Sequence, residues 1–302
     1  MTQLLVGLGP LLVIGIVLLI VLTLRLAEAR APLAAARASG TAHVVASGQK
    51  PDGRGVSVTI DGTPRRTGTI VLAQPQQVAA GATVAVRYDP DSPVDDTAVY
   101  ATGDAAYRAL QDVLYGLVLV VVVLVVAVAV TGLRLLTRRR LRRAPATRAT
   151  ATRMVGRRGL TVRSWLELHT SEGRRWLPVH WSPELAQLEP GGGITLLGDP
   201  ARRLVLPVID GAEVWPSGRL HAREPRGELR VAEPGDAAAE ASWGRQLRSD
   251  VPVLIAAPLL GLLWSYVNGS GVGSFVAATL LTAGVLFWLA QLLGSDPAPP
   301  PR

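Results

Sequence analysis

Cysteine is absent from the 302 residues of this chain, which excludes disulfides and thiolate metal sites. Lysine is almost absent too, because Lys50 is the only lysine among 31 basic residues. Four long apolar runs contain no Asp, Glu, Lys, Arg or His. Against these absences, 49% of the residues are hydrophobic and the mean hydropathy is +0.31. A chain this apolar is unusual for a soluble protein, so membrane segments are the first expectation.

The four apolar runs predict membrane-spanning helices. Leu4–Leu24 and Val113–Leu133 each contain 21 residues, and about 20 residues of helix cross about 30 Å of hydrocarbon. In lipid, a helix satisfies its own backbone, so the valine-rich second run is expected to be helical. Pro252–Val267 is somewhat short, whereas Ser274–Leu293 is full length. The turn residues "NGSGVGS" at 268–274 are expected to join these two runs into a helical hairpin.

Arginine placement predicts the orientation of these helices. The first run lacks a basic flank and has a long apolar core, so it is expected to be an uncleaved helix, not a signal peptide. Taken alone, the first run favours an N terminus outside the cytoplasm, because no Arg or Lys precedes it. The arginines concentrated after the second run outweigh this and predict that the residues after that run are cytoplasmic. Residues 25–112 then lie outside and 137–250 inside. We expect a multi-pass protein of the cell membrane with both termini in the cytoplasm.

The excess positive charge is on the expected inner side. Residues 25–112 are balanced in charge, whereas residues 137–250 carry a net charge of +7. We expect this side to contact the anionic lipids of the inner leaflet. Nucleic acid is not an expected partner, because no recognition module with interleaved aromatic residues accompanies the arginines. The expected inner-leaflet basic cluster is Arg138, Arg139, Arg140, Arg142 and Arg143.

Short strand patterns lie between the first two apolar runs. They are "TAHVVAS" at 41–47, "VSVTI" at 56–60, "TGTIVL" at 67–72 and "TVAVRY" at 83–88, with a turn at "DGTP". Alternation places Val56, Val58 and Ile60 on one face of a strand. Short strands with frequent turn signals predict a small barrel or a sandwich, and the sequence does not choose between them.

One phrase occurs twice. "QVAAGATVAVRYDP" at 77–90 corresponds to "QLEPGGGITLLGDP" at 187–200, and "SWLELHTSEGRRWLPVHW" at 164–181 again predicts strand, turn, strand. We therefore expect two mostly-β modules related by an internal repeat, the second extended by residues 202–220. Glycine favours a tight turn before the strand, and Asp-Pro ends it, so a structural turn is favoured over catalysis. The repeated turn motif is Gly81, Tyr88, Asp89, Pro90, Gly191, Asp199 and Pro200.

The first module resembles the domain-of-unknown-function 3592 family of small, membrane-flanked bacterial β domains. The resemblance depends on "SGTAHVV", "VSVTIDG" and "VAAGATVAVRYDPDSP" and covers about residues 38–100. The second module departs from the pattern, with Gly198 in place of Tyr88. The resemblance implies a bacterial multi-pass envelope protein and brings no established activity. The residues that match the family pattern are Gly81, Val84, Val86, Tyr88, Asp89, Pro90 and Pro93.

Residue patterns typical of chemistry are scarce. The four histidines form neither an HxxxH nor an HExxH pair, and His180 in "PVHW" is expected to be a partly buried structural histidine, with a carboxylate as a possible partner. No nucleophile elbow or P-loop occurs, and "NGSGVGS" follows an apolar run instead of a βαβ strand. We therefore expect no catalytic residue, cofactor or metal ion. The possible ligand or interface aromatics are Trp165, Trp176, Trp181 and Trp215, which otherwise fill a core or rest at the bilayer interface.

The expected protein is thus an integral membrane α-helical protein with four transmembrane helices and two small β modules. It is expected to be a non-enzymatic structural, adaptor or interaction component of the bacterial cell envelope, with protein partners of unknown identity. The alternatives are a transporter or channel accessory subunit and, ranked last, an envelope hydrolase. The expected organisation is helix 1–24, extracytoplasmic β module 25–112, helix 113–136, cytoplasmic β module 137–234, amphipathic linker 235–250, helices 251–267 and 274–294, and Pro-rich tail 295–302.

Overall fold

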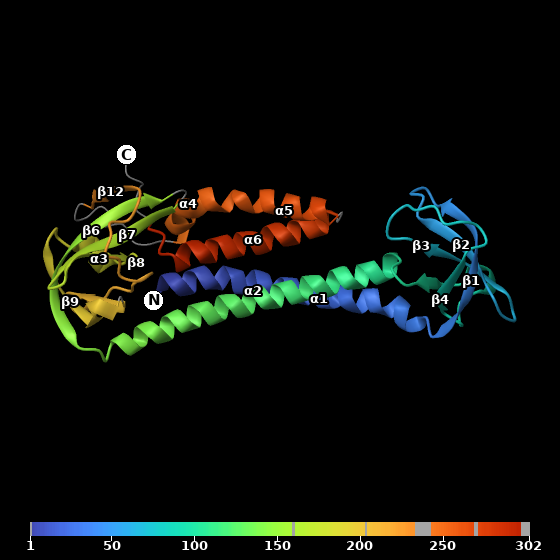
Figure 1. Cartoon of the computed structure of the whole chain (residues 1–302), viewed down its shortest axis with the longest axis horizontal. Helices are drawn as coiled ribbons and strands as arrows, with labels where there is room; N and C mark the ends of the chain where they lie inside the picture. The colour runs from blue at the N-terminus through green and yellow to red at the C-terminus, as the bar shows by residue number, and fades with distance from the viewer. Residues whose placement is uncertain (1, 159–160, 203, 233–242, 269–270, 297–302) are drawn as a thin grey trace. The chain divides into compact units, whose positions relative to one another are not determined.

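The computed structural model describes residues 2–158, 161–202, 204–232, 243–268 and 271–296 (Figure 1). The chain divides into two compact units, which are described separately. The smaller unit is Val17–Val121, and the larger unit combines Met1–Ile16 with Val122–Arg302. Two long helices, α1 (Thr2–Ala35) and α2 (Ala105–Leu141), each pass from one unit into the other.

Within the described residues, four helical segments are long and apolar enough to cross a membrane, as expected: Gln3–Ala35, Ala105–Leu141, Arg248–Val267 and Val272–Leu292. The first two helices extend well beyond the apolar runs that predicted them. Asp104 explains where α2 begins, because its carboxylate accepts the backbone N–H of Tyr107 at 2.9 Å as a helix cap.

The third span differs from the expected boundaries. The expected linker 235–250 lies partly outside the described residues, and its described part is already helical in α4 (Trp243–Leu254). A short break at Ile255 separates α4 from α5 (Ala256–Val267), so the break falls inside the expected span. The helical hairpin expected here is then completed by α6 (Val272–Leu292).

The smaller unit contains one curled antiparallel sheet. Its strands are β1 (Ala38–Gln49), β2 (Gly55–Ile60), β3 (Arg66–Val71), β4 (Thr83–Tyr88) and β5 (Val99–Ala101), in the order β3-β2-β1-β4-β5. The backbone N–H of Thr97, which follows the short helix η1 (Val94–Asp96), donates to the Thr67 carbonyl at 2.8 Å and brings the two sheet edges together. The result is a half-barrel around Val56, Val58 and Ile60, the face that alternation predicted.

The larger unit contains a longer antiparallel sheet (Figure 1). The central strand β6 (Ala146–Arg158) pairs with β7 on one edge, and with β9 and then β12 on the other. The complete order is β11-β10-β9-β6-β7-β8. The other elements are β7 (Thr161–Thr170), β8 (Gly173–Val179), α3 (Pro183–Gln187), β9 (Gly192–Asp199), η2 (Pro200–Arg202), β10 (Leu204–Ile209), β11 (Ala212–Glu213) and β12 (Glu228–Val231).

The two sheets share an order of strands. In each, the first strand is central, the second and third form a meander on one edge, and the fourth and fifth continue the other edge. In both sheets the fourth strand pairs antiparallel with the first, with Val84 opposite Ala42 in the smaller unit and Ile194 opposite Ala149 in the larger one.

Small residues bring the helices of the larger unit close together. A Cβ added to Gly261 of α5 would lie 2.2 Å from the hydroxyl of Thr279 in α6, and one added to Gly7 of α1 would lie 2.5 Å from Gln291. A buried hydrogen bond of 3.0 Å from the Trp288 indole to the Thr131 hydroxyl joins α6 to α2. This packing through small residues and side-chain hydrogen bonds is typical of helices in lipid.

Candidate functional site

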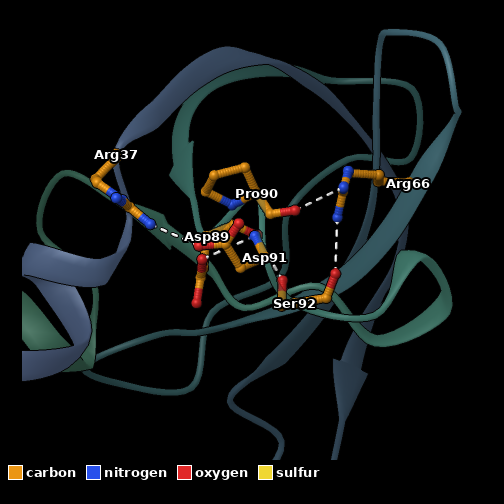
Figure 2. A network of polar contacts seen from close by, with 6 residues as sticks. All are labelled: Arg37, Arg66, Asp89, Pro90, Asp91 and Ser92. Atoms are coloured by element: carbon orange, nitrogen blue, oxygen red, sulfur yellow. Dashed lines mark hydrogen bonds and ion pairs between the residues drawn. The ribbon is translucent and has the colours of Figure 1, made fainter.

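The repeated turn motif of the smaller unit forms a surface network after β4 (Figure 2). The Asp89 carboxylate accepts the backbone N–H of Asp91 at 3.0 Å, so Asp89 closes an Asx turn. Arg66 donates to the carbonyls of Pro90 and Ser92 at 2.8 and 2.9 Å, and its guanidinium lies 5.8 Å from the Tyr88 ring centroid. These contacts order the turn that leads back to β5, which is a structural role.

The similar phrase at 187–200 of the larger unit forms turns of the same kind. The Asp199 carboxylate accepts the backbone N–H of Ala201 at 2.9 Å. Asp89 accepts the backbone N–H of Asp91 in the same way, so both aspartates bind the N–H two residues later. The turn before the strand is also shared, since Gly192 N–H donates to Glu189 and Ala82 N–H donates to Ala79. The structure explains why Gly198 stands where the first module has Tyr88. A Cβ added at this position would lie 2.7 Å from the Leu204 carbonyl of β10.

Gly81→Ala and Gly191→Ala are expected to cost about 1 kcal/mol each in the free energy of unfolding of their own unit. Both glycines have positive φ, 82° and 75°, and neither would bring an added Cβ within 4 Å of another group, so backbone strain alone is changed. Gly193→Ala, without positive φ or a close neighbour, is the control and should cost much less. Denaturant unfolding of the purified chain in detergent measures each cost, and equal costs at Gly191 and Gly193 would contradict the turn assignment.

The expected inner-leaflet basic cluster is divided between two roles. Arg139, Arg140 and Arg143 are exposed. Arg138 is instead buried against the second module, where it donates to the carbonyls of Pro216 at 3.1 Å and Gly218 at 3.3 Å. Arg142 pairs with Glu213 at 2.6 Å. The expectation of five lipid-facing arginines is therefore wrong for Arg138, because its guanidinium satisfies carbonyls of the loop after β11.

The tryptophans of the second module are mostly in its interior. Trp165, Trp176 and Trp215 are buried, and the first two pack with Met154 and Leu229 in a small apolar cluster. Trp181 is half-buried. His180 is fully buried instead of partly, and its backbone N–H donates to the Trp215 carbonyl at 2.8 Å. Its Nδ1 has no hydrogen-bond partner in the part of the chain that the structure describes, so the carboxylate partner considered for it is not found.

A buried group of polar side chains joins the ends of α4 and α6 to the second sheet; we call it the junction cluster. Its centre is an ion pair in which Arg153 Nη2 of β6 lies 3.1 Å from Asp296 Oδ2, with side-chain exposures of 1% and 0%. Ser164 of β7 donates to the same carboxylate. The members are Arg153, Ser164, Asp250, Gln291, Ser295 and Asp296.

The second half of the junction cluster surrounds Asp250 of α4. Its carboxylate accepts the Ser295 hydroxyl at 2.5 Å and the Gln291 side-chain amide. After α6 ends, the chain reverses at Gly294 and aligns beside β7, where Asp296 N–H donates to the Val162 carbonyl at 2.8 Å. The end of α6 is thus held by backbone and side-chain hydrogen bonds to both α4 and the sheet.

The junction cluster is costly to bury. Removing two charges from water costs several kcal/mol each, and the pair compensates only when its remaining polar atoms are satisfied. Within the described residues, Nε and Nη1 of Arg153 and Oε1 of Gln291 are buried without a hydrogen-bond partner. The junction cluster therefore adds little net stability, and its main effect is to fix α4 and α6 against the sheet of the larger unit. No group of three or more His, Asp or Glu side chains in the described ranges is placed to hold a metal ion.

Comparisons with protein-family models, with curated proteins and with solved structures find no match for this chain. The resemblance of the first module to the domain-of-unknown-function 3592 family therefore stays a prediction.

Sequence patterns missed the junction cluster. Ser295 and Asp296 were assigned to a Pro-rich tail and Asp250 to a surface linker, whereas all three are buried. The one available signal was Gln291, a polar residue near the end of an otherwise apolar run.

Proposed function

We propose that this chain is a multi-pass membrane protein that carries one β module on each side of the bilayer and acts as an adaptor of the cell envelope. The observation that carries the proposal is α2, which is continuous from Ala105 to Leu141 and connects the two modules in the chain. A helix of 37 residues is about 55 Å long, more than the hydrocarbon thickness. A single crossing by this helix separates the modules that precede and follow it.

The surface of the helices supports insertion in lipid. Only 11% of the most apolar window of α2 is buried inside the protein. Large apolar side chains such as Val118, Val125 and Leu259 are exposed on these helices. Apolar surface on this scale needs a membrane or a partner to cover it.

The internal repeat is part of the proposal. Its support is the shared strand order, the antiparallel pairing of the first and fourth strands in both sheets, and the Asx turns of Asp89 and Asp199. Two related modules on opposite sides would give the protein comparable binding surfaces in two compartments. Nine basic residues balance the acids of 25–112, and arginine dominates 137–250, which favours the second module inside.

Reporter insertions test the orientation. A reporter that is active only outside the cytoplasm, inserted after Gly62, is expected to be active, and the same reporter after Gly192 is expected to be inactive. Cytoplasmic reporters at the two sites should give the reverse pattern. Equal activity at both sites would contradict a single crossing by α2.

Partner capture tests the adaptor role. Purified from native membranes in mild detergent, the chain is expected to carry partner proteins in fixed proportion to itself. Gly68→Val places a Cβ about 2.3 Å from the Thr97 carbonyl and disrupts the first module, and Gly198→Val disrupts the second. Each variant is the control for the other, because each should lose the partners of its own module only. Loss of no partner in either variant would contradict the proposal.

One observation favours the alternative of a transporter or channel accessory subunit. Asp250 is completely buried and lies within the candidate span Arg248–Val267. An ionisable residue in a membrane span often marks a solute or proton path. Solute flux into liposomes that contain the purified chain, abolished in Asp250→Asn, would select this alternative over the adaptor.

A further inference from the structure

A cavity of about 330 Å³ lies in the larger unit, beside Arg134 of α2 and the end of α6. This is within the size range of small-molecule sites. Its lining comes from Arg134 of α2, from Leu293 after α6, from strands β6, β7, β8 and β12, and from the loop between β11 and β12. The lining includes one carboxylate, Glu224, and five arginines: Arg134, Arg157, Arg163, Arg223 and Arg226.

The arginines of the cavity concentrate positive charge. Arg134 is held in place, because its Nη1 donates to the carbonyls of Ser217 at 2.9 Å and of Leu292. Arg223 and Arg226 are exposed, and no carboxylate of the described residues forms an ion pair with either. Guanidinium groups that share a recess repel one another, and a phosphate relieves this repulsion through charge-assisted, bidentate hydrogen bonds.

The remaining lining is apolar and aromatic. Trp165, Leu229 and Leu293 contribute to it, and the Trp165 ring packs edge-on against His221 with centroids 5.9 Å apart. A ligand that is anionic at one end and apolar at the other fits this combination. Arg134 directly follows the apolar run 113–133, and Leu293 directly follows α6, so the cavity lies where this apolar run and the last candidate span end.

We propose that this cavity binds a phosphate group, either the headgroup of an anionic phospholipid or a soluble phosphate compound. The arginines bind the phosphate oxygens, and the Trp165 side packs against the apolar remainder of the ligand. The lipid source rests on the proposed membrane position of α2 and α6, whereas the phosphate chemistry is independent of it.

Binding by the full chain in a non-ionic detergent tests the proposal. The probes are phosphatidylglycerol, phosphatidylcholine and glycerol phosphate, each titrated and followed by native mass spectrometry. Wild type is expected to prefer phosphatidylglycerol or glycerol phosphate to phosphatidylcholine. Removing two guanidinium groups in Arg223→Ala/Arg226→Ala should weaken this binding about tenfold or more. Arg65→Ala/Arg87→Ala removes the same charge from exposed positions of the smaller unit, outside the cavity and outside the expected inner-leaflet basic cluster, and should change the affinity less than about twofold.

The probes distinguish the two sources. Tight binding of phosphatidylglycerol with weak binding of glycerol phosphate assigns the site to a lipid headgroup, and equal binding of both assigns it to a soluble phosphate. Equal weakening in the two double variants, or no binding of any phosphate probe, overturns the proposal. The reporter insertions at Gly62 and Gly192 test the membrane orientation independently of phosphate binding. If the orientation is wrong, the reporters show it while the phosphate titrations still give the expected result.

Discussion

Asp296→Ala is expected to lower the free energy of unfolding of the larger unit by about 3–5 kcal/mol. The variant leaves the Arg153 guanidinium charged and buried, with a side-chain exposure of 1% and no remaining carboxylate partner at Nη2. Arg153 cannot shed its charge, and its Nε and Nη1 are already without partners among the described residues. Denaturant unfolding of the full chain in detergent, followed by tryptophan fluorescence, measures the loss. All seven tryptophans lie in the larger unit, so the signal reports on that unit alone.

Two further variants make this result specific to a buried pair. Glu213→Ala breaks the more exposed pair with Arg142 and should cost at most about 1 kcal/mol. Arg153→Met/Asp296→Leu removes both charges and should recover most of the loss, because apolar residues often replace a buried ion pair without penalty. A cost for Asp296→Ala no greater than that for Glu213→Ala would show that the junction cluster is not energetically coupled to folding.

The expected recovery also bears on why the pair is present. If the variant with two apolar residues is as stable as the wild type with Arg153 and Asp296, the charges contribute little to the net free energy of unfolding. Their contribution is then positional, because Asp296 accepts from β6 and β7 in directions that an apolar contact does not define. The end of α6 is thereby aligned with the sheet.

Local sequence patterns were sufficient for the strands and turns. Alternation placed Val56, Val58 and Ile60 inward because side chains of a strand alternate between its faces, and no distant residue is needed for that inference. The turn at Glu172-Gly173 was predicted in the same way and joins β7 to β8. Barrel and sandwich could not be separated, because curling depends on contacts between edge strands, here Gly68 with Thr97.

The helix ends were less predictable for a different reason. Hydropathy measures affinity for lipid, whereas a helix ends where its backbone conformation changes. Residues 25–35 are polar enough for water but contain five Ala, two Leu and two Arg, which favour helix, so α1 continues to Ala35. The same distinction explains why α2 begins at Ala105, eight residues before the apolar run.

The junction cluster could not be predicted, because its partners are distant in the chain. Arg153 and Asp296 are 143 residues apart, and Asp250 and Gln291 are 41 residues apart. An aspartate beside an apolar run is ordinarily a surface residue, so nothing local distinguishes Asp296 from a solvated tail. Only the packing of α6 against the second sheet gives these residues a buried role.

Acidification from pH 7 to pH 5 is expected to destabilise the larger unit through His180, by about 2 kcal/mol. Burial, with the nearby positive charges of Arg134 and Arg138, lowers the pKa of His180 to about 3 from 6.5. The unfolded chain therefore binds a proton below pH 6.5 that the folded chain does not bind. Stability from the neutral imidazole is fully present above pH 6.5 and is lost progressively as the pH falls toward 3. Fluorescence-detected unfolding at several pH values measures this slope.

His180→Phe is expected to flatten the dependence between pH 7 and pH 5, even if it changes the stability at pH 7. His169→Gln, at an exposed position of β7 where Nε2 lies 3.5 Å from Glu167 Oε1, is the surface control, and its slope should stay steeper than that of His180→Phe. The junction cluster is the same in all three proteins, so its contribution cancels in the comparison. A slope for His180→Phe equal to that of wild type would place the acid sensitivity in other groups. A reduced slope in His169→Gln would assign it to the surface rather than to the buried ring.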